Sequence, residues 1–174
     1  MPYKGNRSPF DRPVHLQAVK DYLVDRWGAV VTDGEEADDA IGKRMTTQID
    51  GVRFVACSND KDMRMIPGWH YDWPKGELVE VSEIDGWRNF FTQMLVGDRT
   101  DNIPGLEGVG PAKAAAILKG YTKPDTMWCG VFQAYFNRYE LRYNDKLSLK
   151  EALQEIADLL WIRRTGMERW IVPE

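Results

Sequence analysis

The hydrophobic and polar positions of this chain follow two alternating patterns in its first half. Apolar side chains recur every three to five residues over 14–27 and 37–49, which predicts two amphipathic helices. Continuous apolar runs over 28–32 and 52–57, each followed by turn residues, predict two short strands. Because strand, helix and strand in this order form a βαβ unit, we expect a parallel sheet. Residues 63–81, rich in Pro, Gly and aromatic side chains, predict a β-hairpin or irregular strands.

The second half of the chain has a helical pattern almost throughout. Ser82, followed by Asp85 at the spacing of a capping box, predicts the start of a helix that ends at Gly97. We therefore expect an α/β region over 1–81 and an all-helical region over 82–174. The remaining predicted helices begin at Pro111, at Asp125 and at Ser148, the last of these capped together with Glu151.

Length, composition and charge narrow the class of protein. The 174 residues, 43% of them hydrophobic and 29% charged, suit one globular domain or one domain with an appendage. Lys and Arg number 23 against 27 Asp and Glu, and the net charge of −4 argues against a surface that attracts nucleic acid all over. Cys57 and Cys129 have no metal-binding spacing, which favours a reducing cytoplasm. No apolar run reaches the roughly 18 residues of a membrane-spanning helix, so we expect no membrane contact.

Acidic residues gather at the ends of three predicted elements. Carboxylates that follow the strands of an open α/β sheet meet at one edge of that sheet. Such hard oxygen ligands suit Mg²⁺ or Mn²⁺, and two ions held together can assist phosphodiester hydrolysis. For each cluster alone, solvated carboxylates at a helix start or a turn are an equally good interpretation. The clusters consist of Glu36, Asp38 and Asp39; Asp60 and Asp62; and Asp98 and Asp101.

Two further segments could bind phosphate. Residues 105–113 form a glycine-bracketed turn that leads into a helix, where free N–H groups and Lys113 could face a phosphate. A plain connection between helices is the alternative. Lys4 and Arg7 lie three residues apart in the predicted N-terminal loop and could hold a phosphate, or they could belong to a solvated terminus.

Three stretches of this sequence resemble motifs of the 5′-nuclease superfamily, the flap endonucleases and 5′-3′ exonucleases, and most of all its bacteriophage members. They are E-A-D-D at residues 36–39, S-N-D-K-D at 58–62, and the run G-D-R-T-D-N-I-P-G-L-E-G-V-G-P-A-K-A-A at 97–115. The start Y-K-G-N-R at 3–7 is similar to the family's Y-K-x-x-R segment. The resemblance covers residues 1–121 by motif and the remainder by helical character only.

This resemblance implies a fold, a site and an activity. The fold would be an incomplete parallel-sheet nuclease core of the PIN or resolvase type, followed by a helix-hairpin-helix (helix-three-turn-helix) region. The seven acidic residues above would hold two Mg²⁺ or Mn²⁺ ions, and Lys4 and Arg7 would contact the scissile phosphate. The hairpin would grip duplex DNA, with K⁺ as a candidate ion there, through Gly105, Gly108, Val109, Gly110 and Lys113.

The chain departs from the family pattern at its start. Family members begin with two strands that carry metal-binding aspartates, and this sequence begins after them, so we expect a separate N-terminal polypeptide as a partner. The leading hypothesis is a Mg²⁺-dependent 5′-3′ exonuclease or flap endonuclease that acts on 5′ ends or flaps of DNA, in the host cytoplasm if a phage encodes it. The alternative is a DNA-binding module without turnover. Without the seven proposed ligands the bases outnumber the acids, so we expect Mg²⁺ to favour DNA binding.

Overall fold

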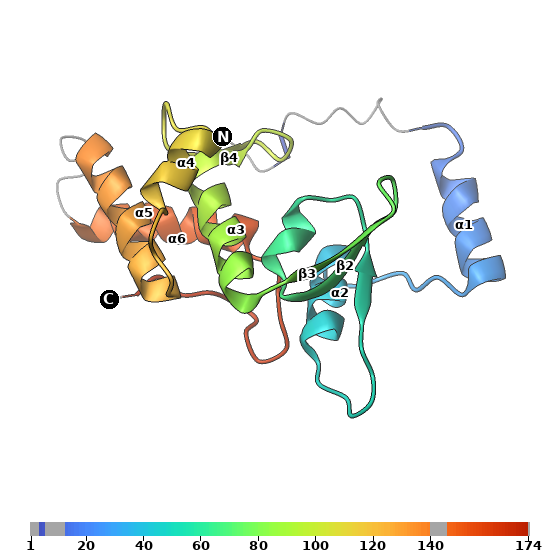
Figure 1. The fold of residues 1–174 in the computed structure, drawn as a ribbon. Coiled ribbons are helices and arrows are strands. Elements are labelled where there is room, and N and C mark those ends of the chain that lie inside the picture. Colours follow the sequence, from blue (N-terminus) through green and yellow to red (C-terminus); the bar gives the residue numbers. More distant parts are fainter. Residues whose placement is uncertain (1–3, 6–12, 140–145, 174) are drawn as a thin grey trace.

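The computed structural model of the chain describes residues 4–5, 13–139 and 146–173 (Figure 1). The proposed phosphate contact Arg7 lies outside these described residues. The elements in chain order are α1 (Leu16–Trp27), α2 (Ala37–Thr46), β1 (Val55–Cys57), the 3₁₀ helix η2 (Asp62–Met65), β2 (Gly68–Asp72), β3 (Glu77–Val81), α3 (Glu83–Val96), β4 (Gly97–Asp98), β5 (Ile103–Pro104), α4 (Pro111–Ile117), α5 (Pro124–Tyr139) and α6 (Lys146–Leu160).

The main sheet has the strand order β1-β2-β3. Strand β1 runs parallel to β2, with Ala56 opposite His70, and β2 runs antiparallel to β3, with His70 opposite Val79. The hairpin predicted over 63–81 is therefore confirmed. The parallel pair differs from the predicted βαβ unit, because the connection between β1 and β2 contains η2 and not a long helix.

The strand predicted over 28–32 is wrong. These residues form no strand, and the side chains of Val30 and Val31 are 89% and 74% exposed. A strand exists only where a neighbour accepts its backbone hydrogen bonds, and no described strand pairs with this segment. The apolar run alone could not reveal that its partner is absent.

Helix α2 is confirmed, but its buried face is not the predicted one. Ile41 is 41% exposed, and the helix ends at Thr46 rather than at residue 49. Its buried residue is Gly42, where an added Cβ would lie 2.4 Å from the carbonyl oxygen of Arg163. The helix packs closely on the C-terminal segment, residues 161–173 after α6, because position 42 has no side chain.

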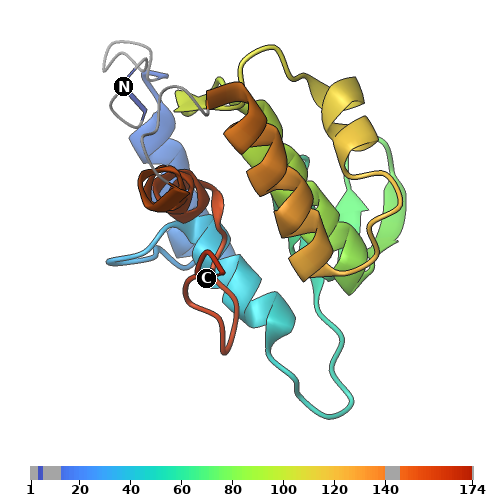
Figure 2. The same ribbon diagram turned by 90° about the vertical axis from the view of Figure 1, so that its left-hand side faces the viewer.

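Helix α3 is the centre of the hydrophobic core. The Ser82 hydroxyl accepts a hydrogen bond from the Asp85 N–H at 3.1 Å, which confirms the predicted cap. Helices α4, α5 and α6 all contact α3, and Figure 2 shows α3 and α5 side by side. The aromatic part of this core joins α3 to the C-terminal segment through Trp87, Phe90, Phe91, Trp161 and Trp170. One core thus draws on residues from both predicted regions, since Met65 and Ile66 belong to it too.

Helices α6 and α1 differ from the prediction: α6 starts at another residue, and α1 has no buried face. Helix α6 begins at Lys146, so Ser148 lies within its first turn. The prediction that Ser148 is the N-cap of this helix is therefore wrong. Helix α1 forms as predicted but buries none of its residues, and it stands apart from the body of the molecule in Figure 1. Within the part of the chain that the structure describes, no helix has the length and apolar character needed to cross a membrane.

Candidate metal centre

One pocket of about 550 Å³ collects carboxylates from three distant parts of the sequence. Its walls come from the start of α2, from η2, from the β4–β5 hairpin and from the C-terminal segment. Asp60 is exposed and is not among the residues that line the pocket. The other proposed ligands do line it: Glu36, Asp38, Asp39, Asp62, Asp98 and Asp101.

Local structure explains why each carboxylate reaches this place. Asp38 and Asp39 lie in the first turn of α2, where the positive end of the helix dipole favours acidic side chains. Asp60 accepts a hydrogen bond from the Asp62 N–H at 2.9 Å, and this local turn sets Asp62 at the start of η2. Asp98 belongs to β4 and is almost fully buried.

Two of the pocket carboxylates, Asp98 and Asp62, have opposite electrostatic environments. Burial acts to raise the pKa of Asp98, but the Thr100 N–H at 2.7 Å and the Lys61 ammonium at 3.2 Å outweigh it, so the pKa is lowered. Burial and the charge of Asp60 raise the pKa of Asp62 to about 6. Of these two carboxylates, Asp62 is the one whose charged form the pocket disfavours.

Asp38 and Gln93 extend the set of oxygen donors. Burial is the main cause that raises the pKa of Asp38, and the charges of Glu36 and Asp39 raise it further. The Gln93 amide N–H₂ donates a short hydrogen bond to Asp62, and the Gln93 Oε1 atom is buried without a hydrogen-bond partner. Sequence reasoning missed Gln93, because an amide on a core helix carries no motif of its own.

Lys4 lies beside this pocket, where it contacts one of the lining carboxylates. Its Nζ is 2.7 Å from Oε1 of Glu36, and its main-chain N–H donates to the carbonyl of Asp101 at 2.9 Å. These contacts place Lys4 against two of the acidic clusters. They put a cation at the rim of the pocket.

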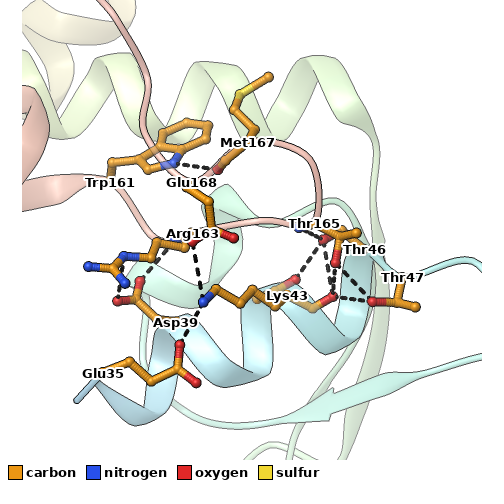
Figure 3. A network of polar contacts seen from close by, with 11 residues as sticks. Glu35, Asp39, Lys43, Thr46, Thr47, Trp161, Arg163, Thr165, Met167 and Glu168 are labelled. Carbon is orange, nitrogen blue, oxygen red and sulfur yellow. Dashed lines mark hydrogen bonds and ion pairs between the residues drawn. The ribbon is translucent and has the colours of Figure 1, made fainter.

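The C-terminal segment forms a wall of the pocket that the sequence did not predict. Residues 158–163 and 168–169, from the end of α6 and from the C-terminal segment, line the pocket. Several polar contacts tie the C-terminal segment to α2 (Figure 3). Lys43 lies between Glu35 at 2.7 Å and Glu168 at 3.3 Å. The Thr165 N–H donates to Oγ1 of Thr46 at 2.9 Å. No spacing in the sequence signals the pairs of Lys43 with Glu168 and of Thr46 with Thr165, because each joins residues more than a hundred positions apart.

The donor set agrees in chemistry with a hard divalent cation. Carboxylate and amide oxygens are what Mg²⁺ and Mn²⁺ prefer, and the unpartnered Oε1 of Gln93 adds one more. Across residues 4–5, 13–139 and 146–173, however, no three Asp, Glu, His or Cys side chains stand close enough to share an ion. Several carboxylates are paired with Lys or Arg instead. An ion would therefore require these side chains to converge.

The glycine-rich turn ahead of α4 contains two kinds of glycine. An added Cβ at Gly105 would lie 2.2 Å from the carbonyl carbon of Val96, so Gly105 allows two stretches of backbone to pack together. Gly108 has φ +76°, and at Gly108 and Gly110 an added Cβ would meet nothing within 4 Å. Lys113 is exposed, and its Nζ donates to the carbonyl of Gly108 at 2.7 Å. The open side of the turn is thus formed by Gly108, Gly110 and Lys113.

Comparison with known proteins supplies independent evidence about the family. No family model matches the chain. It is 33% identical over 146 residues to a 5′-3′ exonuclease of Mycoplasma pneumoniae, covering 72% of this chain and 50% of that protein. It is 32% identical over 131 residues to the thermostable DNA polymerase I of Thermus filiformis, covering 67% of this chain and 15% of the polymerase. It is 32% identical over 108 residues to DNA polymerase I of Rhizobium leguminosarum, covering 56% and 11%.

The chain spans half or less of the length of each of these relatives. All three are bacterial proteins, so the nearer resemblance to bacteriophage members stays a prediction. The names of these relatives, a 5′-3′ exonuclease and two DNA polymerases I, are consistent with the resemblance of the acidic motifs and the 97–115 run to 5′ nucleases. On these grounds the chain belongs to the 5′-nuclease superfamily.

Proposed function

We propose that this protein is a Mg²⁺-dependent nuclease that hydrolyses phosphodiesters of DNA at 5′ ends or flaps. The observation that carries the proposal is the meeting of acidic residues from positions 36–39, 62 and 98–101 in one pocket. Three clusters that serve only local capping would have no reason to line one pocket. The relatives that are named 5′-3′ exonuclease or DNA polymerase I support a DNA substrate.

The residues of the pocket would divide into two roles. Asp38, Asp39, Asp62 and Asp98 would hold the divalent ions, with Glu36 and Asp101 around them and Asp60 positioning Asp62. When bound, such ions activate water and neutralise the charge that develops on the phosphate. Lys4, at the rim, would turn from Glu36 to a phosphate oxygen, and Arg7 would assist it. Hydrogen-bonding side chains of the pocket would orient the phosphate. Because water is the attacking group, the reaction needs no protein nucleophile.

The open side of the turn before α4 would bind the duplex. Gly108 and Gly110 leave space for a phosphate to approach main-chain N–H groups, and Lys113 adds a positive charge there. Leu106 is buried and Val109 half-buried, so the apolar side of the turn is anchored in the core. K⁺ remains our candidate for an ion at this turn.

Gly110→Ala is expected to weaken binding of a 5′-flap duplex about tenfold, the loss of roughly one charge-assisted hydrogen bond. Gly110 has φ −106°, which Ala adopts freely, and the added methyl group meets no protein atom. Gly110 is also the N-cap of α4, where Ala is less favourable than Gly, so the thermal unfolding midpoint should fall only slightly. Fluorescence anisotropy of a labelled 5′-flap duplex, with Ca²⁺ in place of Mg²⁺, measures the affinity. Unchanged affinity in a folded variant would remove this turn from the proposed DNA interface.

A partner polypeptide would complete the sheet. Among the described strands β1 has one neighbour, β2, although the pair is parallel, and Val55 on β1 is 46% exposed. Parallel strands are usually covered and paired on both sides. The Mycoplasma exonuclease is about twice as long as the matched region. We propose that a polypeptide equivalent to its unmatched part adds a strand beside β1.

The catalytic claim is tested with a 5′-labelled duplex. We expect Mg²⁺-dependent release of labelled nucleotides, abolished by a chelator, from this chain either alone or together with the polypeptide encoded immediately upstream. Activity that appears only in the mixture supports the proposed partner. If neither sample cleaves the duplex, the nuclease proposal fails.

One observation favours the alternative, a DNA-binding module without turnover. The pocket carboxylates stand apart and several are neutralised by the protein's own cations, as in Lys4–Glu36 and Lys61–Asp98. Titration with Mn²⁺ separates the two functions. A nuclease binds the ion specifically, and the binding is weakened by Asp62→Asn, whereas a pure binding module shows no specific uptake.

A further inference from the structure

Arg163 and Asp39 form the most direct link between the C-terminal segment and the acidic pocket. The Arg163 main-chain N–H donates to Oδ1 of Asp39 at 2.9 Å, and the Arg163 Nε lies 3.3 Å from Oδ2 (Figure 3). The two oxygens of this carboxylate are thus engaged by different groups. One is held by the backbone, and the other is held by a side chain.

The main chain at residue 163 is fixed on both sides. Ile162 and Arg164 are 4% and 6% exposed. The Arg164 Nη2 donates to the carbonyl of Met65 at 2.5 Å, and its guanidinium lies 4.4 Å from the ring centre of Trp161. Movement of this backbone would break core contacts. The main-chain N–H of Arg163, which donates to Oδ1 of Asp39, is therefore held in place by the core.

The Arg163 side chain is in a different situation. It is 43% exposed, whereas the side chain of Asp39 is only 13% exposed. An ion pair with one solvated partner is weak and its arginine can swing into water at little cost. Such a swing uncovers Oδ2 of Asp39 while the rest of the segment stays in place.

We propose that Arg163 is a tethered counter-ion that competes with a divalent cation for Oδ2 of Asp39. Without the cation, the guanidinium neutralises Asp39 inside a pocket shared with Asp38, Asp62 and Asp98. Entry of the cation displaces the guanidinium toward solvent and leaves the backbone hydrogen bond intact. The inference rests on the proposed function in requiring that the ion enters this pocket.

The test uses calorimetric titration of the whole chain with Mn²⁺. Arg163→Gln should bind Mn²⁺ about three- to fivefold more tightly than the wild type, the change expected for loss of a partly exposed ion pair. Arg138→Gln is the matched control, because the Arg138 side chain is 52% exposed, pairs with Glu107 at 2.8 Å and does not line the pocket. It removes the same charge without touching Asp39, and its effect should stay below about twofold.

A second measurement needs no variant. In the wild type, the Arg163 side-chain Nε–H resonance should shift on addition of Mg²⁺, while its backbone amide keeps the protection of a hydrogen-bonded group. Equal gains in Mn²⁺ affinity for both variants, or no gain for Arg163→Gln, would overturn the competition and leave the proposed metal site intact. If neither the wild type nor any variant binds Mn²⁺, the proposed metal site fails, and this inference fails with it.

Discussion

Asp62→Asn is expected to lower the affinity of the pocket for Mn²⁺ by at least about 100-fold. Removing a residue that only hydrogen-bonds to a metal ligand already costs about 10- to 100-fold, and this substitution removes the charge of a ligand itself. Mg²⁺-dependent cleavage should fall at least as far. Asp62 is the pocket carboxylate whose pKa is raised to about 6, by burial and by the charge of Asp60. A cation therefore gains most at this position.

The substitution should leave the fold intact. Asn keeps the size of Asp62 and an oxygen that can accept the Gln93 hydrogen bond. It also removes repulsion from Asp60 and Asp98, so the unfolding midpoint of the ion-free variant should not fall. Calorimetric titration measures the ion, and thermal unfolding measures the fold.

Asp125→Asn is the matched control for Asp62→Asn. Asp125 is an exposed residue in the first turn of α5, and it does not line the pocket. It undergoes the same change of charge and should keep Mn²⁺ binding within about twofold of the wild type, since exposed charges are screened over about 10 Å. Equal losses in the two variants, or no loss in Asp62→Asn, would place the ion elsewhere.

Gly105→Ala is expected to destabilise the protein by about 3 kcal/mol or more, at the upper end of what overpacking of a core costs. The added methyl carbon would lie 2.2 Å from the carbonyl carbon of Val96 and 2.4 Å from the amide nitrogen of Gly97. Both are backbone atoms, so no side-chain rotation can relieve the contact. The adjacent hydrogen bond from the Leu106 N–H to the carbonyl of Leu95, 2.8 Å long, should weaken as well.

Urea unfolding of Gly105→Ala and Gly110→Ala separates packing from recognition within one turn. The first variant should lose much of its stability, and the second should lose DNA affinity with only a small loss of stability. The motif alone treats the two glycines alike, since both stand in the same Gly-rich run. A Gly105→Ala variant as stable as the wild type would show that the backbone of Val96 and Gly97 can shift freely.

Local signals were sufficient for much of the helical region. The cap formed by Ser82 and Asp85 and the Pro at the start of α4 are effects of nearest neighbours, and both elements begin where these residues predict. Ser148 shows the limit of the same rule: α6 begins two residues earlier, with Ser148 in its first turn. A capping residue marks a possible start, while packing decides which start is used.

The strand predictions failed where a partner was needed. Residues 28–32 have the composition of a strand, but strand structure depends on hydrogen bonds to a neighbour that the described chain does not offer. By contrast, β2 and β3 lie close together in the sequence and provide partners for each other. Short-range pairing was predictable because the turn that joins the strands is itself encoded locally.

The sequence by itself determined the kinds of residue in the candidate site and the family to which the chain belongs. Acidic residues at 36–39, 60–62 and 98–101 and the glycine-rich run after them carry that information in their order and spacing. Only the tertiary structure decided which of these carboxylates share a pocket, leaving Asp60 outside it, and that the C-terminal segment closes one wall. Contacts such as Arg163 with Asp39 join residues 124 positions apart, and they arise from packing around α3 rather than from any local pattern.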